Sequence, residues 1–166
     1  GVALSVYVTV GTGIGGGAVL NGKPLHGLSH PEMGHIRPQR HAADSDFAGI
    51  CPFHGDCLEG LASGPAIKAR WGLSLSELPT DHIGHEVIAW YLAQLTLNLQ
   101  AMMEPGRIVL GGGVTATPGL IDKVRECASA LGGGYFRSDA REIIILPGLG
   151  DRAGLLGALA LAMDPA

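Results

Sequence analysis

The sequence predicts a single α/β domain in which a small sheet is covered by helices. The chain begins with a β-rich apolar run at residues 2–10, and its second half alternates helical periodicity with short apolar runs. With 166 residues, 46% of them hydrophobic and only 16% charged, the chain is long enough for one sizeable core. The 27 glycines occur in separate clusters between apolar runs. This pattern is typical of turns that contact ligands and not of low-complexity sequence.

The first part of the chain predicts a hairpin. The strand at residues 2–10 runs into Gly-Thr-Gly-Ile-Gly-Gly-Gly at residues 11–17, and strand character returns before the turn dipeptide Asn21-Gly22. Glycines at such a tip let backbone N–H groups approach phosphate oxygens, and Thr12 adds a hydroxyl donor. Because no Gly-Lys-Ser/Thr follows and no helix opens here, this is neither a Walker A loop nor the dinucleotide fingerprint. On its residues alone, a plain glycine hairpin remains an alternative.

A metal site is predicted in the first third of the chain. Residues 51–57, Cys-Pro-Phe-His-Gly-Asp-Cys, place two thiols and an imidazole at two-residue spacings, which suits a tetrahedral zinc ion. His35, preceded by a glycine, is the best-placed fourth ligand, and His41 is a rival without such a turn. Four protein ligands would close the coordination sphere, so this zinc is expected to shape a loop. The predicted ligands are His35, Cys51, His54 and Cys57. The alternative is that the two cysteines are ordinary core residues or form a disulfide.

Two glutamates flank these ligands. Glu32 lies three residues before His35, and Glu59 lies two residues after Cys57, so a bound metal would hold both carboxylates on one wall. Paired carboxylates suit sugar hydroxyls. A metal-bound imidazole normally donates from its second nitrogen, so His35 would add a third contact to the same sugar.

The middle of the chain predicts one irregular segment and three helices. Residues 37–50 are polar and are expected to form an exposed connection. Short helices are predicted at residues 58–62 and 63–67, the second stopping at Trp71-Gly72. A longer core-facing helix is predicted from about His85 to Met103. Its apolar residues recur at helical spacing: Ile88, Leu92, Leu95, Leu99 and Met102.

The last third predicts two strands, each followed by a helix. An apolar strand at residues 107–110 ends in three glycines, 111–113, and such turns are where α/β sheets present ligands. A helix over residues 117–131 follows, with Cys127 as a packing residue, and then a strand at 142–146. The final helix, 153–163, is apolar on nearly every side and too short to cross a bilayer, so it is expected to be buried.

This order of elements fits a ribonuclease-H-like half of the actin/hexokinase ATPase architecture, with a zinc-binding loop inserted. Proteins of that class bind ATP between two such halves. The sequence supplies one of them.

The predicted metal loop, residues 51–57, and the segment before it also resemble a known family. Glu32-Met33-Gly34-His35, followed by a loop ending Cys57-Leu58-Glu59-Gly60, resembles the signature of the ROK family of sugar kinases and sugar-responsive repressors. Most members carry three cysteines in that loop. This chain has His54 between two cysteines, and the run CPFHGDCLEGLASGPAI is similar to the bacterial fructokinase branch.

The resemblance implies an ATP-dependent sugar kinase that transfers the γ-phosphoryl group to a hexose, with fructose preferred and Mg²⁺ accompanying ATP. It implies sugar contacts for Glu32, His35 and Glu59. It also implies ATP contacts at two glycine turns, one made of Gly11, Thr12 and Gly13 and the other of Gly111, Gly112 and Gly113.

The resemblance covers only the C-terminal part of such a kinase. An N-terminal half, with its own phosphate turn and the aspartate that acts as base, would precede residue 1. Residues 1–166 are therefore expected to be a C-terminal domain that is inactive in isolation, and no catalytic residue is assigned within it. The alternatives are a sugar-sensing repressor domain of the same family, without kinase activity, and a zinc-stabilised structural module.

Composition limits the classes of partner that this chain is expected to bind. The net charge is -4, with 11 basic and 15 acidic residues, so no basic surface is expected for nucleic acid or a membrane. Three cysteines, a metal loop and no signal peptide argue for the reducing cytoplasm. The expected partners are a hexose, ATP and the missing half, and the resemblance implies a possible homodimer.

Overall fold

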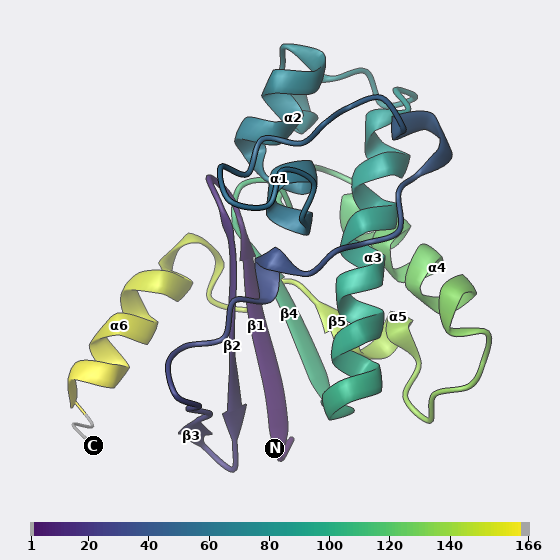
Figure 1. The fold of residues 1–166 in the computed structure, drawn as a ribbon. Helices are drawn as coiled ribbons and strands as arrows, with labels where there is room; N and C mark the ends of the chain where they lie inside the picture. Colours follow the sequence, from purple (N-terminus) through teal and green to yellow (C-terminus); the bar gives the residue numbers. More distant parts are fainter. Residues whose placement is uncertain (1, 164–166) are drawn as a thin grey trace.

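A computed structural model describes residues 2–163 and shows one five-stranded mixed sheet in the order β3-β2-β1-β4-β5 (Figure 1). β1 (Leu4–Val10) pairs antiparallel with β2 (Ile14–Leu20) and parallel with β4 (Arg107–Gly111). β3 (Lys23–Pro24) and β5 (Ile144–Ile145) form the two edges. The predicted hairpin and the parallel strand after the long helix are thus confirmed.

Buried and exposed side chains alternate along β1, and this alternation shows which face of the sheet is buried. Val6, Val8 and Val10 are fully buried, whereas the side chains between them are exposed. The parallel register sets Val6 beside Ile108 and Val8 beside Leu110, so β4 adds its apolar residues to the same face. One face of the sheet therefore contributes its apolar side chains to the core.

Two helices cover this face. α3 (Gly84–Met103) begins and ends within one residue of the prediction, and it packs against α4 (Leu120–Gly132) beside the sheet (Figure 1). Cys127 of α4 is half-buried against the core, as predicted, and burial raises the pKa of its thiol. α4 starts three residues later than predicted, because residues 112–119 form turns in which Gly112 and Gly119 have positive φ angles of 97° and 76°.

Two shorter helices follow the metal loop. α1 (Leu58–Ala62) and α2 (Gly64–Trp71) lie at one end of the sheet (Figure 1). The Ala66 N–H donates to Ser63 Oγ at 3.4 Å, which caps α2. Gly72, with a φ angle of 79°, ends it in the left-handed region. Both helices were predicted, the second as a shorter element.

Two predicted elements differ in extent. The glycine tip is tighter than expected, because β2 begins at Ile14 and takes residues 15–17 into its pairing with β1. The predicted strand at 142–146 is only the two residues of β5, because Asp139 caps a helical turn, α5 (Ala140–Ile143), ahead of it.

The prediction that the last helix is buried is wrong. α6 (Ala153–Met163) stands apart from the layers formed by the sheet and the other helices (Figure 1). Leu155, Leu159 and Met163 are 72%, 53% and 77% exposed. The helix forms where the apolar pattern predicts it, but the described residues place no matching surface over it.

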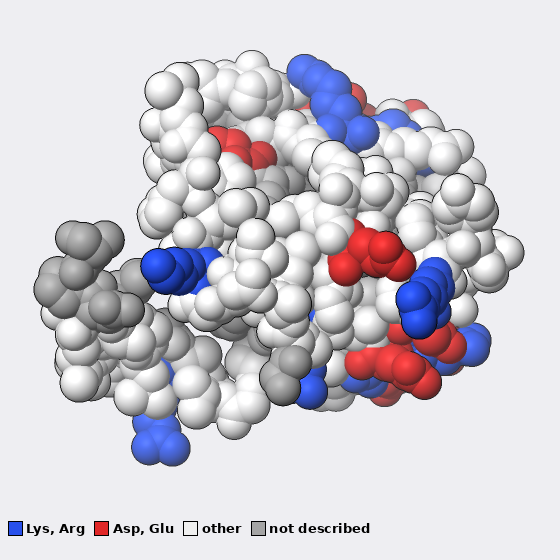
Figure 2. Space-filling model, turned by 90° about the horizontal axis from the view of Figure 1, so that it is seen from below, with Lys and Arg blue, Asp and Glu red and all other residues white. Residues whose placement is uncertain are grey.

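Charged side chains of both signs are scattered over the face seen in Figure 2, without a continuous basic area. No helix within residues 2–163 combines the length and the apolar character that crossing a membrane requires.

Candidate functional site

The four predicted metal ligands lie together. One ligand atom each from His35, Cys51, His54 and Cys57 lies within 4.8 Å of the other three. These residues come from two segments. The 3-10 turn η1 (Met33–His35) carries His35, and the loop before α1 carries the other three.

Three of the distances within this cluster are close to the edges of a tetrahedron. Zn–N bonds of about 2.0 Å and Zn–S bonds of about 2.3 Å imply edges of about 3.3 Å between two nitrogens and about 3.5 Å between nitrogen and sulfur. The Nδ1 atoms of His35 and His54 are 3.3 Å apart. Cys57 Sγ lies 3.4 Å from His35 Nδ1, and Cys51 Sγ lies 3.7 Å from His54 Nδ1. Cys51 Sγ lies 3.9 Å from His35 Nδ1, which is longer than such an edge. The four residues are therefore close to the arrangement that one tetrahedral ion of zinc-like size requires.

The two thiols differ in acidity. Burial opposes ionisation of Cys51, but the backbone groups of Phe53 and His54 and contact with Cys57 lower its pKa below the ordinary value. Burial and the neighbouring Cys51 raise the pKa of Cys57. Such a pair favours one thiolate over two unless a cation balances the second charge.

Glycines shape the loops that carry these ligands. Cys51 and Gly55 exchange backbone hydrogen bonds of 3.1 and 2.8 Å, which fold the loop into a narrow bridge. A Cβ at Gly60 would overlap the Gly55 carbonyl oxygen, and a Cβ at Gly34 would overlap that of Ile14. Gly34 thus permits a close approach, as expected, but to the glycine hairpin and not to the metal itself.

The two flanking glutamates have different surroundings. Glu32 is exposed, with one carboxylate oxygen 2.8 Å from His30 Nε2 and the other 3.8 Å from His35 Nε2. The second ring nitrogen of His35 therefore faces a carboxylate, as metal-bound imidazoles commonly do. Glu59 is half-buried, and its Oε2 accepts a hydrogen bond of 2.8 Å from the Ile14 N–H.

The two predicted glycine turns face one cavity. Gly11, Thr12 and Gly113 lie in its wall, together with Gly64 of α2 and Thr117. The cavity has a volume of about 410 Å³. Thr117 is 4% exposed, and its Oγ1 has no hydrogen-bond partner among the described residues, so a polar group is left for a ligand in this cavity. Gly13, Gly111 and Gly112, the other members of the two turns, do not line the cavity.

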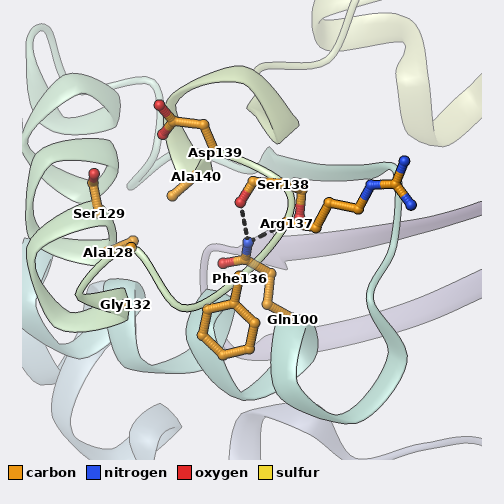
Figure 3. A pocket seen from close by; sticks show the side chains of 10 residues that line it. Gln100, Ala128, Ser129, Gly132, Phe136, Arg137, Ser138, Asp139 and Ala140 are labelled. Carbon is orange, nitrogen blue, oxygen red and sulfur yellow. Dashed lines mark hydrogen bonds between the residues drawn. The ribbon is translucent and has the colours of Figure 1, made fainter.

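A second, smaller cavity of about 220 Å³ lies between α3, α4 and the segment that leads to α5 (Figure 3). The Gln100 amide donates to the carbonyl oxygen of Ser138 at 2.9 Å and to its hydroxyl at 3.1 Å. The side chain of Arg137 points away from the space that these residues enclose (Figure 3). This cavity contains none of the predicted ligand contacts.

A buried ion-pair network that was not predicted lies beside the metal loop. Asp44, expected in an exposed connection, is 5% exposed. Its carboxylate lies 2.9 Å from Arg70 Nε and accepts a 2.6 Å hydrogen bond from the Tyr91 hydroxyl. Arg40 also donates to the backbone carbonyl of Asp44 and to that of Phe47. Residues 37–50 are therefore anchored to α2 and α3 through Asp44. Most of the segment is exposed, as expected, and the expectation fails at Asp44.

Two alternatives for the cysteines and for the fourth ligand are contradicted. Cys51 and Cys57 are free thiols and not a disulfide. The Nδ1 of His41 accepts a 3.1 Å hydrogen bond from the Ala43 N–H, and its ring packs against that of Trp90. His41 is therefore occupied outside the cluster.

A family model, that of the ROK family, matches residues 1–165. The chain belongs to the ROK family. It is 53% identical over 166 residues to a fructokinase of Zymomonas mobilis, covering 98% of this chain and 55% of that protein. A fructokinase of Lactococcus lactis is 44% identical, over 76% of this chain and 43% of its own length. The chain thus spans about half the length of these ROK relatives.

A solved ROK structure supports the fold. The crystal structure of a ROK hexokinase from Thermus thermophilus superposes with a TM-score of 0.72 at 27% identity, covering 99% of this chain and 60% of that one. The actin/hexokinase ATPase-like architecture expected from the order of elements is therefore confirmed.

Proposed function

We propose that this chain is the C-terminal domain of an ATP-dependent hexose kinase with a preference for fructose. One observation carries the proposal most directly. Two glycine turns about a hundred residues apart in sequence line a single cavity, and Glu59, next to the metal cluster, is hydrogen-bonded to the tip of one of them. This arrangement supports a phosphate-binding surface at the turns and a sugar-binding wall beside it.

Glu32, His35 and Glu59 form the proposed sugar wall. Carboxylates accept hydrogen bonds from sugar hydroxyls more strongly than neutral groups do. His35 Nε2 lies 3.8 Å from Glu32 Oε2, so the two groups can contact neighbouring hydroxyls of one ligand. The preference for fructose rests on the similarity to the fructokinases.

A zinc ion is proposed at His35, Cys51, His54 and Cys57. The tetrahedral edge distances support it, and so does the depressed pKa of Cys51, because a thiolate is the form that binds metal. Bound there, zinc would fix the loop that leads into α1, the helix that carries Glu59. With four protein ligands, no position remains for a substrate or water.

ATP is proposed to occupy the cavity of about 410 Å³, which is within the usual size range of small-molecule sites. The turn of Gly11, Thr12 and Gly13 would contact phosphates, and the turn of Gly111, Gly112 and Gly113 would lie against the adenosine. Mg²⁺ would accompany ATP. Transfer of a phosphoryl group depends mainly on positioning and on charge stabilisation, and these are what such turns supply.

The catalytic base and the first phosphate turn are proposed to come from a segment that precedes this chain in the whole protein. Asp44, the most buried aspartate of the described part, is already paired with Arg70 and Tyr91. It is therefore not available to take a proton from a sugar hydroxyl.

The test is a coupled kinase assay on the full-length protein with ATP and Mg²⁺, comparing fructose, glucose and mannose. We expect turnover with fructose at the highest kcat/KM, and a loss of sugar affinity in Glu32→Gln. Fructose binding without any phosphoryl transfer would instead support the repressor alternative. Absence of both would overturn the proposed function.

A further inference from the structure

We propose that Glu59 couples the two substrates, because the carboxylate assigned to the sugar also holds the nucleotide turn in place. This inference rests on the proposed function and adds a role that a purely sugar-binding glutamate would not have. Glu59 then acts as a positioning residue for the turn of Gly11 to Gly13.

The contact between Glu59 and the hairpin is direct. Glu59 Oε2 accepts a hydrogen bond of 2.8 Å from the Ile14 N–H, the first residue of β2. A Cβ at Gly13 would lie 2.7 Å from the same oxygen. Only glycine at position 13 therefore lets the carboxylate lie against the tip without displacement.

Glu59 is itself firmly held. It lies in the first turn of α1, which Cys57 of the metal cluster precedes as N-cap. The Ser63 N–H donates to the Glu59 carbonyl oxygen at 3.1 Å, and the Gly64 N–H donates to that of Gly11 at 2.7 Å. The metal loop, α1, the start of α2 and the hairpin tip thus form one connected set of contacts.

The two carboxylate oxygens can serve different partners. Oε2 is used by Ile14, and among the described residues no hydrogen bond to Oε1 is present. A sugar hydroxyl that donates to Oε1 would change the charge distribution and the orientation of the same carboxylate that accepts a hydrogen bond from Ile14. Sugar binding therefore changes how strongly the turn is held. By thermodynamic linkage, nucleotide binding must change sugar affinity by the same factor.

The decisive variant is Gly13→Ala in the full-length protein. A methyl group there pushes against Glu59 Oε2, so we expect KM for fructose to rise about fivefold or more although the change lies on the nucleotide turn. Gly17→Ala is the matched control. It makes the same substitution in the same hairpin, where an added Cβ meets nothing within 4 Å. Its KM for fructose should stay within about twofold of the unmodified protein.

A mutant cycle tests whether Gly13 acts through Glu59. In a Glu59→Ala background, Gly13→Ala should add little further to the fructose KM, because the side chain that the new methyl group would meet is absent. Independent, additive increases from the two substitutions would overturn the inference.

Hydrogen exchange gives a readout that needs no turnover. In the unmodified protein without nucleotide, saturating fructose should change the exchange rate of the Ile14 amide and leave that of Gly17 unchanged. This measurement also decides the matter if Gly13→Ala fails to fold. Fructose that binds calorimetrically without affecting Ile14 would overturn the coupling while leaving the proposed function intact. Absence of fructose binding would overturn both.

Discussion

Replacing Asp44 with alanine should destabilise the protein by about 3–5 kcal/mol, because it leaves the buried guanidinium of Arg70 without a counter-ion. The two side chains are 3% and 7% exposed and lie 2.9 Å apart, so water cannot substitute for the lost carboxylate. The Tyr91 hydroxyl also loses its acceptor, which adds about 1 kcal/mol. Since domains are stable by only about 5–15 kcal/mol, this one change would remove about a quarter or more of the total.

The assay is urea unfolding followed by tryptophan fluorescence. The chain has two tryptophans, and both adjoin the network: the Arg70 guanidinium lies 4.7 Å from the Trp71 ring, and the Trp90 indole donates to Gln39. With an m value of about 2–3 kcal/mol per molar urea, the midpoint should fall by about 1–3 M. Asp46→Ala, at an exposed position in the same segment, should change stability by less than about 0.5 kcal/mol. Equal midpoints for the two variants would show that the ion pair does not hold residues 37–50 in place.

Three further predictions follow from the same contacts. Burial and the hydrogen bond to Asp44 raise the pKa of Tyr91 to about 12, above the ordinary value of about 10. The neutral hydroxyl therefore contributes stability that is fully present below about pH 10 and lost as pH rises toward 12, an effect of about 2–3 kcal/mol. Tyr91→Phe should lack this alkaline loss in unfolding midpoints measured between pH 8 and 12. Protein purified without chelator should contain one zinc per chain with a two-sulfur, two-nitrogen shell by X-ray absorption, and Cys57→Ser should reduce the zinc content. A shell without sulfur in the unmodified protein would contradict the cluster. The 166-residue chain alone should show no fructose phosphorylation above background, since the proposed base lies outside it. Turnover that a substitution of one of its own aspartates abolishes would place the base within this chain.

Local spacing explains why the metal cluster could be predicted from the sequence. Three of its ligands lie within residues 51–57, and a segment that short has few ways to arrange two thiols and an imidazole. His35 was harder to assign, because it is 16 residues away from Cys51. The glycine before it pointed to a close approach, and the structure shows such an approach, although to the Ile14 carbonyl.

The network around Asp44 left no comparable pattern. Asp44 and Arg70 are 26 residues apart, and Tyr91 is a further 21 residues along, so no periodicity links them. A polar stretch such as residues 37–50 normally predicts solvent exposure. Asp44 can be buried because Arg70 and Tyr91 contact its carboxylate and Arg40 donates to its backbone carbonyl. These contacts exist only after α2 and α3 have packed. Long-range polar contacts of this kind depend on the tertiary structure, whereas ligand spacing and helix caps are local.

The last helix was predicted correctly as a helix but incorrectly as a buried one. Its apolar residues recur on every side, and that pattern predicted both that residues 153–163 are helical and that they are covered. The first inference is local and holds, because helix propensity needs no partner. The second concerns a surface elsewhere, and with Leu155 at 72% and Met163 at 77% exposure the described residues do not supply it. A long apolar helix face rarely stays open to water in a working protein. Since the chain spans about half the length of its fructokinase relatives, α6 is consistent with the proposal that this domain works together with a second one.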